Sequence, residues 1–448
     1  MPEEKQTTLS RRAFVGSAAA LAALPGDSPA ESADKLRMAE QPSQTRLVGL
    51  TLAELRRRYH DELFNIVIPF WDKHGIDHEL GGFMCVLDHD GTPVNTDKFL
   101  WFQGRGIWVY SYLYRHFGKD TRHLEIARKA RDFALKHFRQ EDGAFAQLVS
   151  REGRVLQPPK PDTSGALSIA EGLQAWAAAT GDEESRDLAL KIIKDLFRQM
   201  SRPSAFGSAR KQGFWFINLL IATRVLRESH DAEIAEIADA AVDAIVNRHF
   251  NPDTGLNNET LNHDFTRPPG EATLTIIGHS IEALWMVMEE ALRRKDERLF
   301  ATCAERVRRH IEVGWDRVYG GLIHAINVDQ TCYQWPVERP VGTSYAFRFT
   351  GEHHYMKTLW SLDEVLVSTL KTLEHQDAEW AARYFDLAQE FIDSKLSMKK
   401  HGHPLHLLFA DRQITHQPHI SRQDNYHHFR MLMFNMQALD RMIRSGKR

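Results

Sequence analysis

The sequence predicts an all-α protein folded as an (α/α)6 barrel, with short β-hairpins forming one mouth of the barrel. Three observations support this fold class. Apolar residues recur at helical spacing in twelve stretches, these stretches follow one another as six pairs, and glycine-led segments lie between alternate pairs. The twelve stretches are residues 51–73, 104–117, 122–139, 165–180, 183–200, 213–228, 231–249, 278–294, 297–314, 359–375, 378–396 and 425–443.

The glycine-led segments share one pattern, in which strand-like residues lead into a polar turn. Glycine, asparagine and aspartate tolerate the positive φ angles that tight turns need, so each segment is typical of a short β-hairpin. The segments repeat in pattern rather than in identity. They begin at Gly81, Gly143, Gly320 and Gly402 and reach their turns at residues 88–91, 151–154, 327–329 and 410–412.

Alternate helices are expected to form an inner ring enclosed by an outer ring. Residues 213–226 (GFWFINLLIATRVL) are apolar on nearly every side, as a helix covered on all faces should be. Residues 186–200 (RDLALKIIKDLFRQM) have one polar face, which indicates an outer helix. An open α-solenoid is the structural alternative. The hairpins favour the closed ring, because there they can wall off one mouth and form a pocket.

The N-terminal region has a different character from the rest of the chain. Ser10, Arg11, Arg12 and Phe14 stand before a short alanine-rich run, in an order that resembles the twin-arginine export signal. The run falls short of the roughly 20 residues that a membrane-spanning helix needs. The sequence thus predicts a signal peptide and disordered linker over residues 1–45, a single catalytic domain over 46–448, and export to the periplasm. A disordered tail with two chance arginines, on a cytoplasmic protein, is the alternative.

Composition narrows the classes of function. The chain is 42% hydrophobic and 26% charged with a formal net charge of -3, which is ordinary for a globular protein. It lacks the clustered Lys and Arg of a nucleic-acid-binding domain. Its three cysteines specify neither a disulfide framework nor a metal site. Whether the protein is a monomer or a homodimer is left open.

Polar residues concentrate at the beginnings of the expected inner helices. His279 and Glu282 are three residues apart, as are His427 and Arg430, so each pair shares a helix face. Burying so many charges without partners is costly, and convergence on one pocket would explain them. The candidates, in chain order, are Trp101, Arg105, Trp108, Tyr110, Tyr112, Glu171, His279, Glu282, Trp360, Glu364, His427 and Arg430.

Plainer interpretations exist for each of these residues. His279 and Glu282 can form a local hydrogen bond within one helix, and Trp108 can be a packing residue. A metal bound by His279, Glu282 and His427 is a further hypothesis. Glu282 and Glu364 could instead be the acid and base of a glycoside hydrolase, which would leave the two histidines and two arginines without a role.

Four motifs resemble one known family. DKFLWFQGRGIW around Arg105, GHSIEALW around His279, KTLWSLDEV around Glu364 and YHHFR around His427 are similar, in order and placement, to the N-acylglucosamine 2-epimerases and the related cellobiose 2-epimerases and mannose isomerases. The resemblance extends from about residue 50 to the end of the chain. Its family fold is an (α/α)6 barrel, in agreement with the helix pattern.

The resemblance implies interconversion of sugars at C2 of the ring-opened form. It would make His279 and His427 the general acid and base, and would assign Arg105, Glu282, Glu364 and Arg430 to holding and polarising the substrate. Inverting C2 requires proton removal on one face and return on the other, and histidine titrates in the suitable range. The enediolate also needs electrostatic stabilisation. No metal, nicotinamide or flavin is required, and Trp101 and Trp360 would stack on the sugar. Tyr110 and Asn218 are further candidates for substrate binding.

The chain departs from the family pattern where substrate would be selected. Some relatives carry a further histidine on the helix that here reads FWFINLL, where this chain offers Asn218 or Phe216. Leu359 and Trp360 replace a double tryptophan, and the stretch between Gly321 and Lys357 is longer than the family needs. The substrate is therefore left open among an aldose, an N-acylhexosamine and a reducing-end disaccharide. An aldose–ketose isomerase, a glycoside hydrolase or a non-catalytic sugar-binding protein on the same barrel are the alternatives.

Overall fold

The computed structural model describes residues 45–160, 164–202, 209–268, 274–327, 355–415 and 423–447. These residues belong to one compact unit that begins at Thr45. The predicted signal peptide and most of the long stretch between Gly321 and Lys357 lie outside the described residues. None of the described helices combines the length and apolar character needed to cross a membrane.

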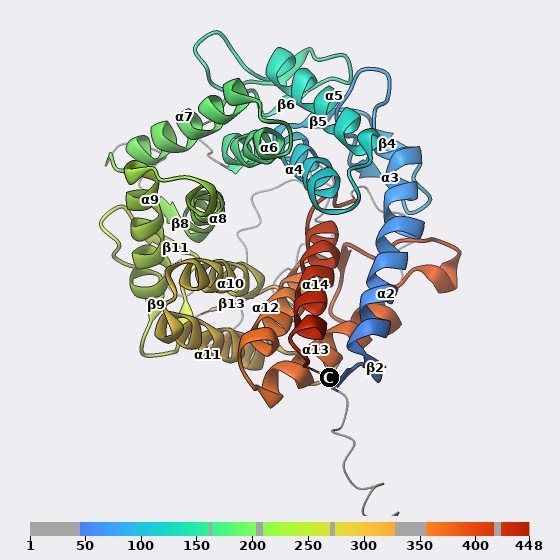
Figure 1. Ribbon diagram of the computed structural model, residues 1–448, viewed down its shortest axis with the longest axis vertical. Coiled ribbons are helices and arrows are strands. Elements are labelled where there is room, and N and C mark those ends of the chain that lie inside the picture. The colour runs from blue at the N-terminus through green and yellow to red at the C-terminus, as the bar shows by residue number, and fades with distance from the viewer. Residues whose placement is uncertain are drawn as a thin grey trace, which may run out of the picture. The chain divides into compact units, whose positions relative to one another are not determined.

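Six helices form an inner ring in which each helix packs against the next (Figure 1). The ring closes between its last and first members, where Nδ2 of Asn425 donates to the carbonyl of Phe102 at 2.9 Å and the Tyr112 hydroxyl donates to Gln437 at 2.7 Å. This closure rules out the open solenoid. The inner helices are α4 (Leu100–His116), α6 (Ser164–Thr180), α8 (Gln212–Glu228), α10 (Ile277–Arg294), α12 (Leu359–His375) and α14 (His427–Arg444).

An outer ring of amphipathic helices covers the inner one, and each outer helix packs on one inner partner (Figure 1). Most outer helices begin at a side-chain cap such as Asp120, Asp182, Asp231 or Asp296, which accepts a backbone hydrogen bond from the first turn. The outer helices are α2 (Leu52–Glu62) continuing through η1 (Leu63–Val67) into α3 (Ile68–His74), α5 (Thr121–His137), α7 (Glu183–Met200), α9 (Ala232–Asp243) with η3 (Ala244–Arg248), α11 (Glu297–Gly314), and α13 (Glu379–Phe391) with η4 (Ile392–Leu396); a short 3-10 turn, η5 (Lys399–His401), follows.

Short antiparallel strands gather at the mouth where the inner helices begin. In four places, the strand that leads into an inner helix pairs with a strand from the next hairpin along the chain. These pairs are β5 (Lys98–Phe99) with β6 (Leu148–Val149), itself paired with β7 (Val155–Gln157); β8 (Ala209–Lys211) with β11 (Thr260–Asn262); β12 (Leu274–Ile276) with β13 (Ala325–Asn327); and β14 (Lys357–Thr358) with β15 (Phe409–Ala410). The remaining pairs are β1 (Arg46–Leu47) with β2 (Leu50–Thr51), β3 (Val86–Leu87) with β4 (Pro93–Asn95), and β9 (Phe250–Asn251) with β10 (Leu256–Asn257).

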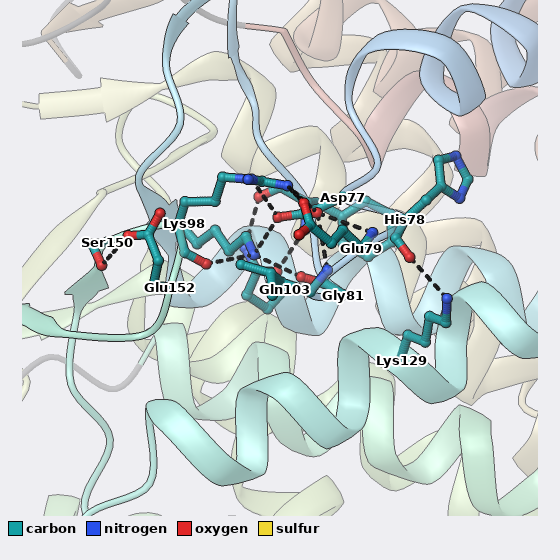
Figure 2. A network of polar contacts seen from close by, with 12 residues as sticks. Asp77, His78, Glu79, Gly81, Lys98, Gln103, Lys129, Ser150 and Glu152 are labelled. Carbon is teal, nitrogen blue, oxygen red and sulfur yellow. Dashed lines mark hydrogen bonds and ion pairs between the residues drawn. The ribbon is translucent and has the colours of Figure 1, made fainter.

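A buried ionic clamp fixes the first hairpin to the start of α4. Nζ of Lys98 lies 3.0 Å from Oδ2 of Asp77 and donates to the carbonyl of Gly81 at 2.7 Å, as Figure 2 shows. The same carboxylate accepts from Nε of Arg151, on the second hairpin, at 2.9 Å. Although burial raises the pKa of Asp77, its hydrogen bonds with Arg151, Leu80 and Lys98 outweigh that effect and the pKa is lowered.

The clamp is repeated at the start of α12. Nζ of Lys357 lies 2.9 Å from Oδ2 of Asp316, which also accepts from Nε of Arg412 at 2.9 Å. Lys98 and Lys357 each stand three residues before a tryptophan in the first turn of an inner helix, so the repeat makes Trp101 and Trp360 equivalent in position. The internal repeat expected from the glycine-led segments is thus confirmed at the level of side-chain contacts.

One boundary was placed too late by the sequence pattern. The second stretch was expected to begin at residue 104, but α4 begins at Leu100, and Gly104 and Gly106 lie inside the helix. A Cβ on Gly104 would lie 2.2 Å from the backbone of Ser168 on α6, and one on Gly106 would lie 2.1 Å from the ring of Phe83. Gly104 thus allows the backbones of α4 and α6 to pack closely, and Gly106 leaves room for the ring of Phe83.

Candidate active site

The two candidate histidines lie in the first turns of α10 and α14, at the mouth that carries the hairpins. The ring of Trp360, in the first turn of α12, lies beside both of them. Its centroid is 5.2 Å from that of His279 and 5.5 Å from that of His427. The structure therefore brings His279, His427 and Trp360 together from three inner helices, as the sequence predicted.

His279 is held by a carboxylate on the hairpin side of the mouth. Its Nδ1 lies 3.1 Å from Oε1 of Glu259, in the connection between β10 and β11. Burial lowers the pKa of His279, but the charge of Glu259 and the hydrogen bond with it outweigh burial and raise the pKa. The side chain keeps 30% of its surface exposed, and Nε2 has no hydrogen-bond partner among the described residues. One nitrogen of this ring is thus held in place while the other remains available.

His427 is held in the same manner by a carboxylate of an inner helix. Its Nδ1 lies 2.9 Å from Oε1 of Glu364 on α12. The other oxygen of Glu364 accepts from the indole Nε1 of Trp285 at 2.6 Å. In the described part of the chain, Nε2 of His427 has no hydrogen-bond partner. Both histidines therefore present Nε2, and each is oriented through Nδ1 by a glutamate.

Arg430 is the cation at the centre of these contacts. Its Nη2 donates to Oε1 of Glu282 at 2.6 Å and to Oε1 of Glu364 at 2.5 Å, and its Nη1 donates to the hydroxyl of Tyr426 at 3.1 Å. The side chain of Arg430 is only 1% exposed. Although burial raises the pKa of Glu364, the charge of Arg430 and the hydrogen bond with His427 outweigh it and lower the pKa to about 2.

This geometry changes the assignment of three residues. Glu282, Glu364 and Arg430 were expected to hold and polarise substrate, but all three are buried, and both glutamates accept from Arg430. They position His427 and α10, α12 and α14 relative to each other. The alternative of a local hydrogen bond between His279 and Glu282 does not hold, since His279 bonds to Glu259 and Glu282 bonds to Arg430.

The hydrolase and metal hypotheses fit this arrangement poorly. Glu282 and Glu364 share one guanidinium nitrogen, so they do not flank a space for a glycosidic bond, and the low pKa of Glu364 makes it unsuited to be a general acid. Oxygens of these two residues and a nitrogen of His427 do cluster tightly. Arg430 contacts all three residues, with His427 Nδ1 at 3.3 Å, and so occupies the position that a metal ion would need.

Arg105 differs from Arg430 in having no carboxylate partner. It lies in the second turn of α4, is partly exposed, and places its guanidinium 4.8 Å from the ring centroid of Tyr426. It forms no ion pair or hydrogen bond with any described residue. Its charge lowers the pKa of His279, which indicates that the two cations are close. Arg105 is therefore a cation available to an oxygen of a bound molecule.

A second polar chain runs beneath the histidines. Oε1 of Glu171 on α6 accepts from the hydroxyl of Tyr426 and from Nη1 of Arg224, each at 2.7 Å. Below this layer, the C-terminal halves of the inner helices surround a separate cavity of about 460 Å³, lined by residues such as Arg115, His116 and Lys371. The cavity opens at the other mouth of the barrel, so it is not part of the histidine site.

Two candidates for substrate binding lie apart from the histidine pair. Tyr110 is fully buried, and its ring packs against Phe83, His123 and Phe429, between the inner and outer rings. Asn218 is fully buried and donates to the carbonyl of Phe214 in its own helix at 2.7 Å. Neither side chain faces the histidines, which corrects their assignment to substrate binding.

Trp101 is partly exposed at the start of α4. Its ring stacks on that of Phe99, with centroids 6.2 Å apart, and meets Phe102 edge-on. Of the equivalent residues Trp101 and Trp360, Trp360 is the one whose ring contacts those of the two candidate histidines. Stacking of Trp101 on a sugar stays a prediction.

His428 points away from its neighbour His427, as the helical spacing requires. Its Nδ1 lies 2.9 Å from Oδ1 of Asp363 and its Nε2 lies 3.2 Å from Oε1 of Glu62. Burial would lower the pKa of His428, but these two carboxylates raise it to about 10. For the neighbouring His406, burial outweighs the charge of Glu62 and lowers the pKa to about 4.

Sequence reasoning missed the partner that orients His279. Glu259 lies in a connecting segment, NNET, whose sequence does not reveal which helix it will face. Tyr426, next to His427 in the YHHFR motif, was likewise not singled out, although it links Arg430 to Glu171. Both contacts join segments far apart in the chain, so the spacing of residues along the sequence does not predict them.

Comparison with known proteins shows the family and the fold. Residues 81–430 match the family model described as N-acylglucosamine 2-epimerase. The N-acylglucosamine 2-epimerase of Mus musculus is 27% identical over 299 residues, which cover 63% of this chain and 71% of that protein. The structure of cellobiose 2-epimerase from Bacillus thermoamylovorans B4167 superposes with a TM-score of 0.70 at 15% identity, covering 86% of this chain and 99% of that one. A crystal structure of D-mannose isomerase gives a TM-score of 0.70 at 12% identity, covering 86% and 97%.

Proposed function

The chain belongs to the N-acylglucosamine 2-epimerase family and is an isomerase, and we propose that it interconverts C2 epimers of a sugar through the ring-opened form. The proposed reaction removes the proton from C2 on one face and returns a proton on the other face. An enediolate forms between the two steps. The substrate class is an aldose, an N-acylhexosamine or the reducing end of a disaccharide.

The observation that carries this proposal is the pair of glutamate-held imidazoles beside one tryptophan. A histidine whose Nδ1–H bonds to a carboxylate keeps Nε2 as the nitrogen that exchanges protons. Glu259 orients His279 in this way, and Glu364 orients His427. Two such groups from different helices supply the two acid/base residues that inversion at C2 requires.

The roles of the two histidines exchange with the direction of reaction. His279, whose pKa is raised, holds a proton more readily and is proposed to act as the acid that protonates C2 when His427 is the base. In the reverse direction, His427 returns the proton and His279 removes one. After one turnover His427 holds the proton taken from C2 and His279 has given its proton to the product. Proton exchange of the two rings with solvent then restores the starting state, so no net proton is consumed.

Arg105 is proposed to stabilise the enediolate. Deprotonation next to an aldehyde places negative charge on the carbonyl oxygen, and a cation fixed near that oxygen lowers the barrier. Arg105 is suited to this role because it is partly exposed and no described carboxylate neutralises it. Arg430 acts indirectly, by holding Glu364 and hence the ring of His427. These proton transfers need no metal, nicotinamide or flavin.

The experiment that tests the function is incubation of the purified protein in D2O with glucose, mannose, N-acetylglucosamine, N-acetylmannosamine and cellobiose. Proton NMR at C1 and C2 then follows both exchange and product. A C2 epimer carrying deuterium is the expected result and names the substrate class. A ketose without the epimer would instead identify an aldose–ketose isomerase. No exchange with any sugar, from folded protein, would contradict both and favour sugar binding or hydrolysis.

We also propose that the protein is exported to the periplasm by a twin-arginine-type signal within residues 1–45. The Ser10–Phe14 segment and the alanine-rich run after it support this proposal. An extracytoplasmic enzyme would meet free sugars and oligosaccharides. Sequencing the mature N-terminus of protein recovered from the periplasm tests it. An intact Met1 on cytoplasmic protein would contradict export.

A further inference from the structure

Three potential metal ligands meet outside the histidine pair, between the inner and outer rings. They are Glu62 at the end of α2, His406 on the segment before β15, and His428 in the first turn of α14. Their donor atoms all lie within 4.8 Å of one another. Oε1 of Glu62 is 3.2 Å from Nε2 of His428 and 3.8 Å from Nδ1 of His406.

The contact between Glu62 and His428 requires a proton or a metal ion between the two atoms. Nδ1 of His428 lies 2.9 Å from Oδ1 of Asp363, and a proton on Nδ1 satisfies that bond. In the neutral ring, Nε2 then carries a lone pair, which would face a carboxylate oxygen. Two acceptors at this distance repel each other. Either a second proton or a metal ion must lie between them.

The spacing of the donors suits a metal ion. Zinc binds imidazole nitrogen and carboxylate oxygen at about 2.0–2.2 Å in tetrahedral geometry, which puts neighbouring donors roughly 3.4 Å apart. The two distances from Glu62 lie on either side of that value. Asp363 would hold the far nitrogen of His428, as carboxylates commonly do for zinc-bound histidines.

We propose that Glu62, His406 and His428 bind a first-row divalent metal ion, for which Zn²⁺ is the best fit. Two imidazoles and one carboxylate form a borderline-soft donor set that suits Zn²⁺ better than Ca²⁺ or Mg²⁺. The proposed metal site is separate from His279 and His427, because His428 faces away from His427. It goes beyond the proposed epimerase function and does not depend on it.

The site is accessible from the surface. Glu62 and His406 line a groove of about 550 Å³, together with Asn65, Ser397 and Lys399. A water from this groove can take the fourth position that three protein ligands leave open. The metal would join α2, α14 and the last hairpin, and its binding free energy would add to the stability of the fold.

Titration of the full chain with Zn²⁺ tests the proposal. The protein is first dialysed against a chelator, and then binding is followed by calorimetry and metal content by mass spectrometry. We expect one tightly bound equivalent and a higher melting temperature with Zn²⁺. His406→Ala and Glu62→Gln should each abolish binding of this Zn²⁺ equivalent. Asp363→Asn should weaken binding about 10- to 100-fold.

His403→Ala is the matched control, since His403 lies on the same hairpin segment but outside the cluster, where its ring meets that of His89. It should bind Zn²⁺ like the natural chain. Should His406→Ala fail to fold, as judged by circular dichroism, His406→Gln replaces it. The proposal would be overturned if the folded natural protein bound no Zn²⁺, or if the His406 variant still bound one equivalent of Zn²⁺. The contact between Glu62 and His428 would then be held by a proton.

Discussion

Nδ1 of His427 lies 2.9 Å from Oε1 of Glu364, and that same oxygen accepts a hydrogen bond from Arg430 at 2.5 Å. One carboxylate therefore fixes a histidine and is itself fixed by a buried guanidinium. The sequence suggested that these residues bind substrate. In the structure Glu364 and Arg430 are buried and hold the ring of His427, which supports the proposal that Nε2 of this histidine faces the substrate.

Arg430→Lys tests this positioning role. A lysine cannot serve Glu282, Glu364 and Tyr426 together, so we expect the free energy of unfolding to fall by about 2 kcal/mol. Turnover should fall while KM changes little. Denaturant melts and steady-state kinetics measure both effects. The control is Arg56→Lys in the half-exposed pair with Asp440, where the change in stability should stay within about 0.5 kcal/mol. A raised KM with unchanged stability would instead mean that Arg430 contacts substrate.

Glu259→Gln should move the pH profile. The charge of Glu259 outweighs burial and raises the pKa of His279, so its removal lowers that pKa. His279 then loses its proton at lower pH, and the alkaline limb of kcat/KM shifts to lower pH. Turnover should fall on the order of 100-fold, since the ring also loses its orientation. Glu184→Gln, at an exposed position on α7, should change neither property. An unchanged alkaline limb would contradict the role of Glu259 in raising the pKa of His279.

Arg105→Met separates catalysis from stability. Arg105 has no ion-pair partner among the described residues, so its replacement leaves no buried charge and the melting temperature should hardly change. Loss of the cation near the enediolate should lower turnover roughly 100- to 1,000-fold. Arg115→Met on the same helix, at the other mouth, is the matched control and should keep full turnover. Normal turnover in the Arg105 variant would contradict its proposed role.

Asp77→Ala probes the clamp that attaches the first hairpin to α4. It leaves Lys98 buried without a carboxylate, which should cost about 3–5 kcal/mol of unfolding free energy. Adding Lys98→Met should recover part of that loss, because both buried charges are then gone. Asp187→Ala, at an exposed position on α7, is the control and should cost little. A double variant as unstable as Asp77→Ala alone would show that packing, and not charge, sets the cost.

Much of the fold was predictable because helical periodicity and glycine-led turns are local signals. The twelve expected helices correspond to the two rings, and the hairpins lie at the mouth that was expected. The sequence pattern placed His279, His427, Trp360 and Arg105 correctly at helix beginnings for the same reason. Local spacing identifies the start of a helix, and the closed ring brings the starts together.

The remaining errors have a common physical cause. Inner helices are apolar on every side, so periodicity cannot tell which face looks into the barrel, and Tyr110 and Asn218 were assigned to the wrong face. The partners of charged residues are equally hidden, because Glu259 reaches His279 and Arg430 reaches Glu282 across the ring. Such contacts form only when the barrel closes, so the spacing of residues along the sequence does not predict them.

The central claim is that two histidines act on opposite faces of C2, and single-histidine variants test it most directly. His279→Asn and His427→Asn should each fold normally and each lose epimer formation in D2O, as proton NMR of the preferred sugar would show. His116→Asn, at the other mouth, should retain epimer formation. Epimer formed at a near-normal rate by either His279→Asn or His427→Asn would contradict the two-histidine account.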